Sequence, residues 1–292
     1  MKLNIDRLIC LSVSGEISHP TLRKTGYVIS SQGQAEVYPS VGGISYNVRI
    51  GDPATGWMAD HVEPGVSIRN TAPAMGEFSA NGALNVLACL GNRAQMISGE
   101  AKGENGFVTG KHGGVDHVLV DFPPEVLEKL MPGDKVLVQS LGVGLRLLDY
   151  YPDIKVMNLD PALLQNLPIT EGKTLGIAVT HLIPAKLMGA GIGSISAHSS
   201  DCDIQIFDEQ AINEYRLHEL RLGDIIAITD ADSSYGWIYR EGAVSIGVVV
   251  HSNSVISGHG PGVVTILTSA TGRIKPAMDK SANLKNFLAK MK

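Results

Sequence analysis

The chain has few cysteines, few aromatic residues and no long apolar run. Its three cysteines, Cys10, Cys89 and Cys202, are far apart and form no C-x-x-C pair, so neither a disulfide framework nor a cysteine metal site is supported. No segment approaches the roughly 18 consecutive apolar residues of a membrane span. The apolar run at residues 8–13 is too short for a signal peptide. We therefore expect a reduced, cytoplasmic chain that makes no membrane contact.

Charge of either sign is also scarce. Charged residues make up 18% of the chain, and 24 Lys and Arg against 29 Asp and Glu leave a net charge of −5. This balance provides no overall positive field for nucleic acid or anionic membranes. Nucleic acid is therefore not an expected partner, whereas small molecules, metal ions and proteins are.

Glycine is abundant, and its abundance indicates the fold class. There are 33 glycines while aromatic residues make up only 5%, a combination typical of many tight turns and short strands. We predict a mainly β protein with short helices. The expected strands are residues 8–13, 26–30, 44–50, 117–122, 135–139, 174–181, 225–229, 242–250 and 265–268. The expected helices are residues 79–90, which should be buried, a short helix after Pro123-Pro124, residues 160–166 and 208–220, and an amphipathic helix from residue 284 that docks on the body or on a neighbouring subunit.

Three segments are expected along the chain: a β-rich N-terminal segment at residues 1–96, a small barrel at residues 97–149, and a Gly- and Ser-rich β body at residues 150–292. The spacing Gly103-x-x-Gly106-x-Val108 resembles SH3-like barrels of the KOW type, some of which bind RNA. Lys102, Lys111 and His112 give this segment a modest basic character. The alternative is a barrel with a purely structural role, because phosphate binding needs several basic residues acting together.

The densest group of acids, histidines and glycines lies between residues 222 and 262. His251 ends an apolar strand, and His259 lies in a glycine-rich loop. With Asp203 they form a mixed imidazole and carboxylate set that suits Zn²⁺, Mn²⁺ or Fe²⁺. Asp230 and Asp232 are candidates for a further ligand or a catalytic base. The alternative is that the histidines only complete a strand end and a turn, and that the two aspartates are solvated turn residues.

A glycine-rich loop precedes these acids and is expected to shape the pocket. Gly189, Gly191 and Gly193 match neither the dinucleotide nor the P-loop pattern, so they more simply allow the backbone to turn closely around a site. Asp201 would share one strand face with Asp203. His61 belongs to the irregular loop at residues 51–64, and such loops often carry functional residues.

Covalent catalysis has no matching arrangement. No serine lies in a G-x-S-x-G pattern, and Cys202 lies between two aspartates, whose negative charge raises the pKa of a thiol and makes it a poor nucleophile.

Several long pieces of the chain resemble one prokaryotic family. They are VGGISYNVRIGDPATGWMADHVEPGVSIRN (residues 41–70), SGEAKGENGFVTGKHGGVDHVLVDF (98–122), VMNLDP (156–161), MGAGIGS (188–194) and GAVSIGVVVHSNSVISGHGPGVVTILTS (242–269). The chain is identified by them as a member of the uncharacterised family of domain of unknown function 4438. The resemblance implies a small SH3-like barrel set into a larger β-rich body. It implies no activity, substrate or cofactor.

Together these patterns predict a metal-assisted hydrolase or lyase that acts on a small amide or carbonyl compound. In this respect the chain resembles formamidase and acetamidase proteins. These proteins also have a Gly-Asp pair just before a strand, together with glycine-rich loops that contain His and Asp. The alternative is a non-catalytic binding module that uses the barrel to hold RNA or a protein partner. A third reading is assembly through glycine-rich surfaces, and we expect a homo-oligomer.

Overall fold

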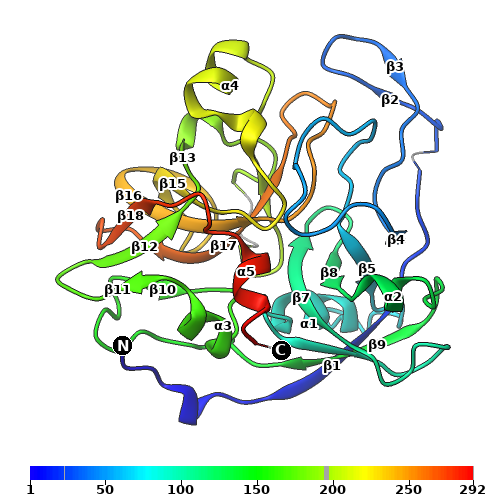
Figure 1. Cartoon of the computed structure of the whole chain (residues 1–292), viewed down its shortest axis with the longest axis horizontal. Coiled ribbons are helices and arrows are strands. Elements are labelled where there is room, and N and C mark those ends of the chain that lie inside the picture. The colour runs from blue at the N-terminus through cyan, green and yellow to red at the C-terminus, as the bar shows by residue number, and fades with distance from the viewer. Residues whose placement is uncertain (23, 194–196, 292) are drawn as a thin grey trace.

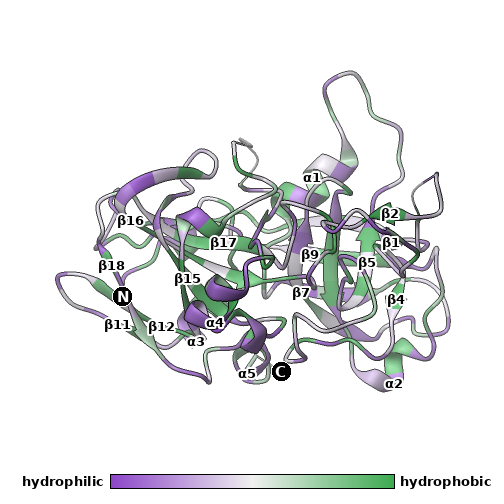
Figure 2. Ribbon diagram, turned by 90° about the horizontal axis from the view of Figure 1, so that it is seen from above, coloured by the Kyte–Doolittle hydropathy of each residue, from purple (hydrophilic) through white to green (hydrophobic). Residues whose placement is uncertain are grey.

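The computed structural model describes residues 1–22, 24–193 and 197–291 and shows a mainly β protein, as predicted. A closed barrel and a second, mixed sheet lie next to each other, with short helices at their edges (Figure 1). In the view turned by 90°, hydrophobic residues are concentrated in the strands of both bodies (Figure 2). In the described part of the chain, no helix is long and apolar enough to cross a membrane.

The barrel has six antiparallel strands in the order β1-β9-β6-β7-β8-β5, and β5 pairs back with β1 to close it. Its strands are β1 (Leu11–Ile17), β5 (Gly65–Arg69), β6 (Arg93–Met96), β7 (Asn105–His112), β8 (His117–Asp121) and β9 (Lys135–Ser140). Valines from these strands, including Val66, Val108 and Val138, fill its interior. A short strand, β4 (Ile44–Ser45), extends the sheet beside β5.

The barrel is larger than the predicted segment at residues 97–149. That segment supplies only β7, β8 and β9, and the other three strands come from residues 1–96. Three strands alone would leave two edges with unpaired backbone groups, and closure by β1, β5 and β6 removes those edges. The predicted boundary at residues 96 and 97 therefore falls inside one closed barrel.

The second sheet is built on the long strands around residues 225–269. Its order is β10-β17-β16-β15-β13, and β14 pairs with β17. The strands are β10 (Lys155–Val156), β13 (His181–Pro184), β14 (Cys202–Asp203), β15 (Ile225–Asp232), β16 (Ile238–Val249) and β17 (Gly262–Ser269). Two smaller sheets contain β11 (Ile169–Thr170), β12 (Leu175–Val179) and β18 (Ile274–Met278), and β2 (Val28–Ile29) with β3 (Ala35–Glu36). The apolar run at residues 225–229 lies in β15, and the strand predicted at residues 242–250 lies in β16 up to Val249, because most of these side chains are buried in this sheet.

Helices are short and begin at the predicted caps. They are α1 (Ala80–Leu87), α2 (Pro124–Leu127), α3 (Pro161–Asn166), α4 (Glu209–Tyr215) and α5 (Leu284–Leu288), with 3-10 turns η1 (Ile5–Arg7), η2 (Ala185–Leu187) and η3 (Leu217–Glu219). Asp160 and Asp208 cap α3 and α4 with their side chains. The helix predicted over residues 208–220 is broken at Arg216, which adopts a left-handed φ of 56°.

The burial predicted for the helix at residues 79–90 is wrong. In α1, Leu84 and Asn85 are buried, but Ala80, Ala83 and Val86 are exposed. The helix packs on the barrel through one side only, beside β1 and β8. Small apolar residues cost little when they face water, so an apolar composition did not require a buried helix.

A buried lysine joins the barrel to the second body. Lys111, on β7, is fully buried, and its Nζ donates hydrogen bonds to Asn158 Oδ1 at 2.7 Å and to the His198 carbonyl at 2.7 Å. Burial lowers the pKa of Lys111 to about 8, so the ammonium is still mainly protonated at pH 7. Lys111 is therefore not available to a phosphate backbone, which the RNA-binding interpretation of this segment would need.

Replacing this lysine should destabilise the protein. In Lys111→Met, the Asn158 amide oxygen and the His198 carbonyl lose their donor while they remain buried. We expect the free energy of unfolding to fall by about 2–4 kcal/mol, the penalty for leaving such acceptors unpaired. Urea denaturation measures it. The matched control Lys102→Met, on an exposed turn, should change stability by less than about 0.5 kcal/mol, and an equal loss in both variants would contradict the assignment.

Candidate metal centre

Imidazole and carboxylate side chains converge where the β7–β8 hairpin of the barrel meets the second sheet, between β14 and the end of β16. The contributing residues are His61 from the loop after β4, His112 at the end of β7, Asp201 and Asp203 at β14, His251 after β16, and His259 in the loop before β17. Strands β7 and β17 pack against each other here. The site therefore joins the two bodies of the protein.

The six side chains form two groups of three. His61, Asp203 and His259 make one group, and His112, Asp201 and His251 make the other. In each group, one ligand atom per residue lies within 4.8 Å of the other two, which is close enough to surround a single ion. The groups adjoin, because the ring centroid of His61 lies 5.2 Å from that of His251 and 5.7 Å from that of His112.

The distances in the first group are short. Asp203 Oδ2 lies 3.2 Å from His259 Nδ1 and 3.7 Å from His61 Nε2. The two ring nitrogens are 3.1 Å apart. Asp203 Oδ2, His259 Nδ1 and His61 Nε2 therefore lie close enough together to coordinate one cation.

In the second group the closest approach is between His251 Nε2 and Asp201 Oδ2, at 2.7 Å. The same nitrogen lies 3.6 Å from Asp203 Oδ1. Asp201 Oδ1 accepts a hydrogen bond from the Gly113 backbone at 2.7 Å, which fixes the carboxylate beside the barrel hairpin. This group is more deeply buried than the first, because the His251 side chain is fully buried whereas that of His259 is 36% exposed.

Three of the four imidazoles are oriented through Nδ1 by an oxygen acceptor. His61 Nδ1 lies 3.2 Å from Asp60, and His112 Nδ1 lies 2.6 Å from Glu63. His251 Nδ1 lies 2.9 Å from the carbonyl of Ser252. An Nδ1–H that donates to oxygen leaves the Nε2 lone pair free, and metal-binding histidines are held in this way by their outer partners. The tautomers of His61 and His112 follow from these acceptors. His251 also donates through Nε2 to Asp201 Oδ2 at 2.7 Å, so this nitrogen gives up its proton when it binds an ion.

Glu63 is the central outer partner. The carboxylate is fully buried and accepts hydrogen bonds from His112, from His117 Nδ1 at 3.1 Å, from Ser67 and from the Gly42 backbone. Burial alone would raise the pKa of Glu63, but the bonds from His112 and His117 hold that pKa well below its usual range. A permanently charged carboxylate therefore orients His112.

Removing this charge should weaken metal binding without removing a ligand. Glu63→Gln keeps the size of the side chain, but one acceptor oxygen and the negative charge are lost. We expect the affinity for the ion held by His112 to fall by about 10- to 100-fold, the usual effect of losing such a partner. Competition with a chromophoric chelator measures the affinity. Glu104→Gln, on an exposed turn, is the matched control, and equal affinities for the two variants would show that Glu63 does not act on the centre.

The electrostatics of the cluster favour positive charge. Burial alone would lower the pKa of His251, yet Asp201 and Asp203 raise it well above its usual value. The pKa of Asp203 is correspondingly far below normal, because hydrogen bonds with His251, His259 and His61 outweigh the effect of burial. Burial and the two neighbouring aspartates also raise the pKa of the Cys202 thiol, as predicted, so it is a poor nucleophile.

Backbone geometry around the cluster depends on glycine and on one strained residue. A Cβ on Gly262 would lie 2.1 Å from both Asp201 Oδ2 and His251 Nε2, so only glycine lets these two side chains meet. His61 adopts a left-handed φ of 53°, a conformation that is rare outside glycine and concentrated at functional sites. Its backbone N–H is held by the Asn253 carbonyl at 3.1 Å.

The predicted pocket loop lies beside this cluster. A Cβ on Gly191, which has a φ of 99°, would come within 2.7 Å of the Asp201 carbonyl, and one on Gly189 within 2.1 Å of the Gly258 carbonyl. Gly193 has a φ of 81° and no such close neighbour among the residues that the structure describes. Two of the three glycines therefore allow the close backbone approach that the sequence suggested.

The structure brings together five of the predicted site residues: His251, His259, Asp203, Asp201 and His61. It does not bring Asp230 and Asp232 to them. Asp232 pairs with Ile238 beside the β15–β16 turn, whereas His251 follows the other end of β16. Asp230 Oδ1 accepts a hydrogen bond from the Gly242 backbone at 2.8 Å, and Asp232 Oδ1 one from Ser234 at 2.9 Å. Because β15 and β16 are antiparallel, the end of β15 points away from the end of β16, and we withdraw these two aspartates as site residues.

Four further residues were not singled out as site residues from the sequence: Asp60, Glu63, His112 and His117. His112 was considered only for its basic character. The sequence did contain a pattern that could have identified His112 and His117, because these two histidines flank the short turn Gly113-Gly114-Val115-Asp116. In the structure they face each other as a strand pair. Glu63 carried no local signal, since its partners lie 49 and 54 residues away.

A hollow of about 450 Å³ opens over the cluster. It is lined by Thr21, Leu22, Ser40, Val41, Asp60, His61, His112, Gly113, Gly114, Val115, Ala190, Gly191, Ser200, Asp201, Asp203 and His259. Among these described lining residues none is Lys or Arg. The hollow thus combines small apolar and hydroxyl side chains with one polar end, where the histidines and aspartates lie.

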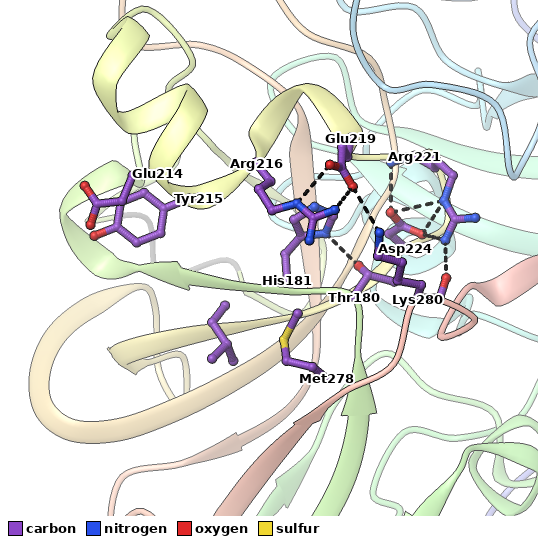
Figure 3. Close-up of a pocket in the computed structure, with 11 residues that line it drawn as sticks. Thr180, His181, Glu214, Tyr215, Arg216, Glu219, Arg221, Asp224, Met278 and Lys280 are labelled. Atoms are coloured by element: carbon purple, nitrogen blue, oxygen red, sulfur yellow. Dashed lines mark hydrogen bonds and ion pairs between the residues drawn. The ribbon is translucent and has the colours of Figure 1, made fainter.

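A second hollow, of about 570 Å³, lies between β13, α4 and the end of β18 (Figure 3). Arg216 pairs there with Glu219, and Arg221 pairs with Asp224 at 2.8 Å. Lys280 lies 3.8 Å from Glu219. These charges already pair with one another, so we place the candidate site at the histidine cluster.

A closed barrel joined to a mixed sheet, with histidines and aspartates gathered at the junction, defines a β-rich protein with a candidate metal centre. The chain belongs to the family of domain of unknown function DUF4438, as predicted: the N-terminal domain of the family matches residues 27–165 and the C-terminal domain residues 164–288. The chain is also similar to the crystal structure of TM1086, with 48% identity and a TM-score of 0.92 over 98% of this chain and 99% of that chain. No curated protein matches the chain.

Proposed function

We propose that this protein is a metal-dependent hydrolase that acts on a small amide or other carbonyl compound. The observation that supports the proposal is the convergence of four imidazoles and two carboxylates at one end of a hollow large enough for a small molecule. The imidazole and carboxylate set favours Zn²⁺, Mn²⁺ or Fe²⁺ over Ca²⁺. Such an ion supplies a hydroxide near neutral pH and polarises a carbonyl group.

The chain's own residues would hold and orient the reacting groups. Asp60 and Glu63 fix the rings of His61 and His112, so that the ligand nitrogens face the hollow in a set direction. The apolar side chains of Leu22, Val41 and Val115 would exclude bulk water from the bound substrate. In the reaction, the oxygen of water forms a bond to the carbonyl carbon, and the C–N or C–O bond breaks. The products are a carboxylic acid and an amine or alcohol, and no redox partner is needed.

The barrel offers less support for a nucleic-acid-binding function. Lys111 and His112, which gave residues 97–149 their basic character, are buried inside the protein. Of the basic residues considered there, Lys102 is exposed. Lys129, Lys135 and Arg146 are also exposed in residues 97–149, but four cations are still fewer than the six to ten phosphate contacts of a typical nucleic-acid complex.

The proposal is tested with untagged protein and a His251→Ala/His259→Ala double variant. Elemental mass spectrometry after exchange into chelator-treated buffer should find Zn, Mn or Fe in the parent and none in the folded variant. A panel of small uncharged amides, esters and lactones should then be hydrolysed by the parent, with a loss of at least about 10³-fold in the variant. A parent that binds no ion after incubation with these metals would overturn the proposal, as would equal hydrolysis by both proteins.

A further inference from the structure

Asp203 is placed between the two groups of ligands and faces both. Its Oδ2 lies 3.2 Å from His259 Nδ1, and its Oδ1 lies 3.6 Å from His251 Nε2. A carboxylate whose two oxygens face different sets of imidazoles can bridge two ions. We propose that the centre holds two divalent ions with Asp203 as the bridging ligand, an inference that rests on the proposed function and extends it.

The inner ion would be held by His112, Asp201 and His251, with Asp203 Oδ1 as the fourth ligand. These four side chains are all buried. Four protein ligands complete a tetrahedral shell, which is the pattern of ions that stabilise structure. The inner ion therefore ties the barrel hairpin to the second sheet.

The outer ion would be held by His61, His259 and Asp203 Oδ2. All three of these residues line the hollow, as do His112 and Asp201 of the inner group, whereas His251 does not. Three protein ligands leave one position open, which is the pattern of catalytic ions that bind water or substrate. The outer ion is thus the one that would meet the substrate.

The charge of the buried carboxylates matches that of two divalent ions. Asp60, Glu63, Asp201 and Asp203 are four buried carboxylates that surround the imidazoles. Imidazoles that bind an ion are neutral, so two divalent ions supply four positive charges, which equals the number of these carboxylates. Uncompensated buried charge is strongly unfavourable.

The experiment is a titration of metal-free protein with Mn²⁺, followed by electron paramagnetic resonance, with bound ion counted by equilibrium dialysis. The parent should bind two ions, and the two spins should couple because one carboxylate joins them. His259→Ala should keep the inner ion and lose at least about 10-fold in affinity for the outer ion. His251→Ala should instead lower the affinity for the inner ion. His61→Ala repeats the outer-site test if the His259 variant does not fold. His218→Ala, on exposed η3, is the matched control and should bind two ions.

Stoichiometry separates this inference from the proposed function. A parent saturated at one ion that still hydrolyses its substrate would overturn the two-ion site and leave the hydrolase proposal standing. A parent that binds no ion would overturn both. Two ions without spin coupling would overturn the bridging role of Asp203.

Discussion

Asp203→Asn is expected to lose both ions from the centre, the largest effect of any single substitution in this protein. Asp203 is the residue that contacts both groups of ligands, with carboxylate oxygens 3.2 Å from His259 and 3.6 Å from His251. The amide has almost the same size but carries no charge and only one acceptor oxygen. We expect each affinity to fall by at least about 100-fold, above the effect of losing an outer partner alone. Elemental analysis after dialysis measures the bound metal.

The matched control for that experiment is Asp230→Asn. Asp230 also adopts a left-handed φ, of 58°, in which asparagine is well tolerated, and it lies at the far end of the β15–β16 hairpin from His251. The control should keep its full metal content. Equal metal loss in the two variants would mean that the effect arises from the sheet as a whole and not from the ligand.

Removing the metal from the parent is expected to lower its stability strongly. The folded state holds the ligands together, and the unfolded chain separates residues such as His61 and His259, which are 198 positions apart. An ion present at about 1,000 times its Kd stabilises the folded state by about 4 kcal/mol. Chelation should therefore lower Tm by about 10 °C or more in a chain of this length. Differential scanning calorimetry measures it, and adding Zn²⁺ or Mn²⁺ should restore the original Tm.

Asp203→Asn provides the reference for this second experiment as well. Its Tm should already be low and should not change when the chelator is added. If the parent loses its ions to the chelator with no change in Tm, the ions do not connect the barrel to the second sheet, and the structural role given to the inner ion would be incorrect.

Much of the local structure could be predicted from the residues. Asp160 followed by Pro161 indicates a helix start, and α3 begins there because the aspartate side chain caps it. The β-branched run at residues 242–249 indicates a buried strand, and it forms most of β16. Asp203, His251 and His259 indicate a metal centre by their residue types, and the structure places them together.

Other features depended on contacts between distant parts of the chain. His112 and Asp201 belong to one ligand group although a barrel strand and the second sheet supply them. Asp230 and Asp232 are closer in sequence to His251 than Asp203 is, yet the antiparallel course of β15 carries them away from it. The proximity of residues in the chain was therefore a poor guide to the composition of the site.

The sequence alone determined the class of fold, the caps and strands, and the kinds of side chain available for a metal, because these depend on periodicity and local backbone preferences. The tertiary structure decided how the barrel closes, since β1 and β5 must pair across more than fifty residues. It also decided which carboxylates meet which imidazoles. Those pairings arise where β7 packs against β17, and burial at that junction fixes the positions of Glu63, His112 and Asp201.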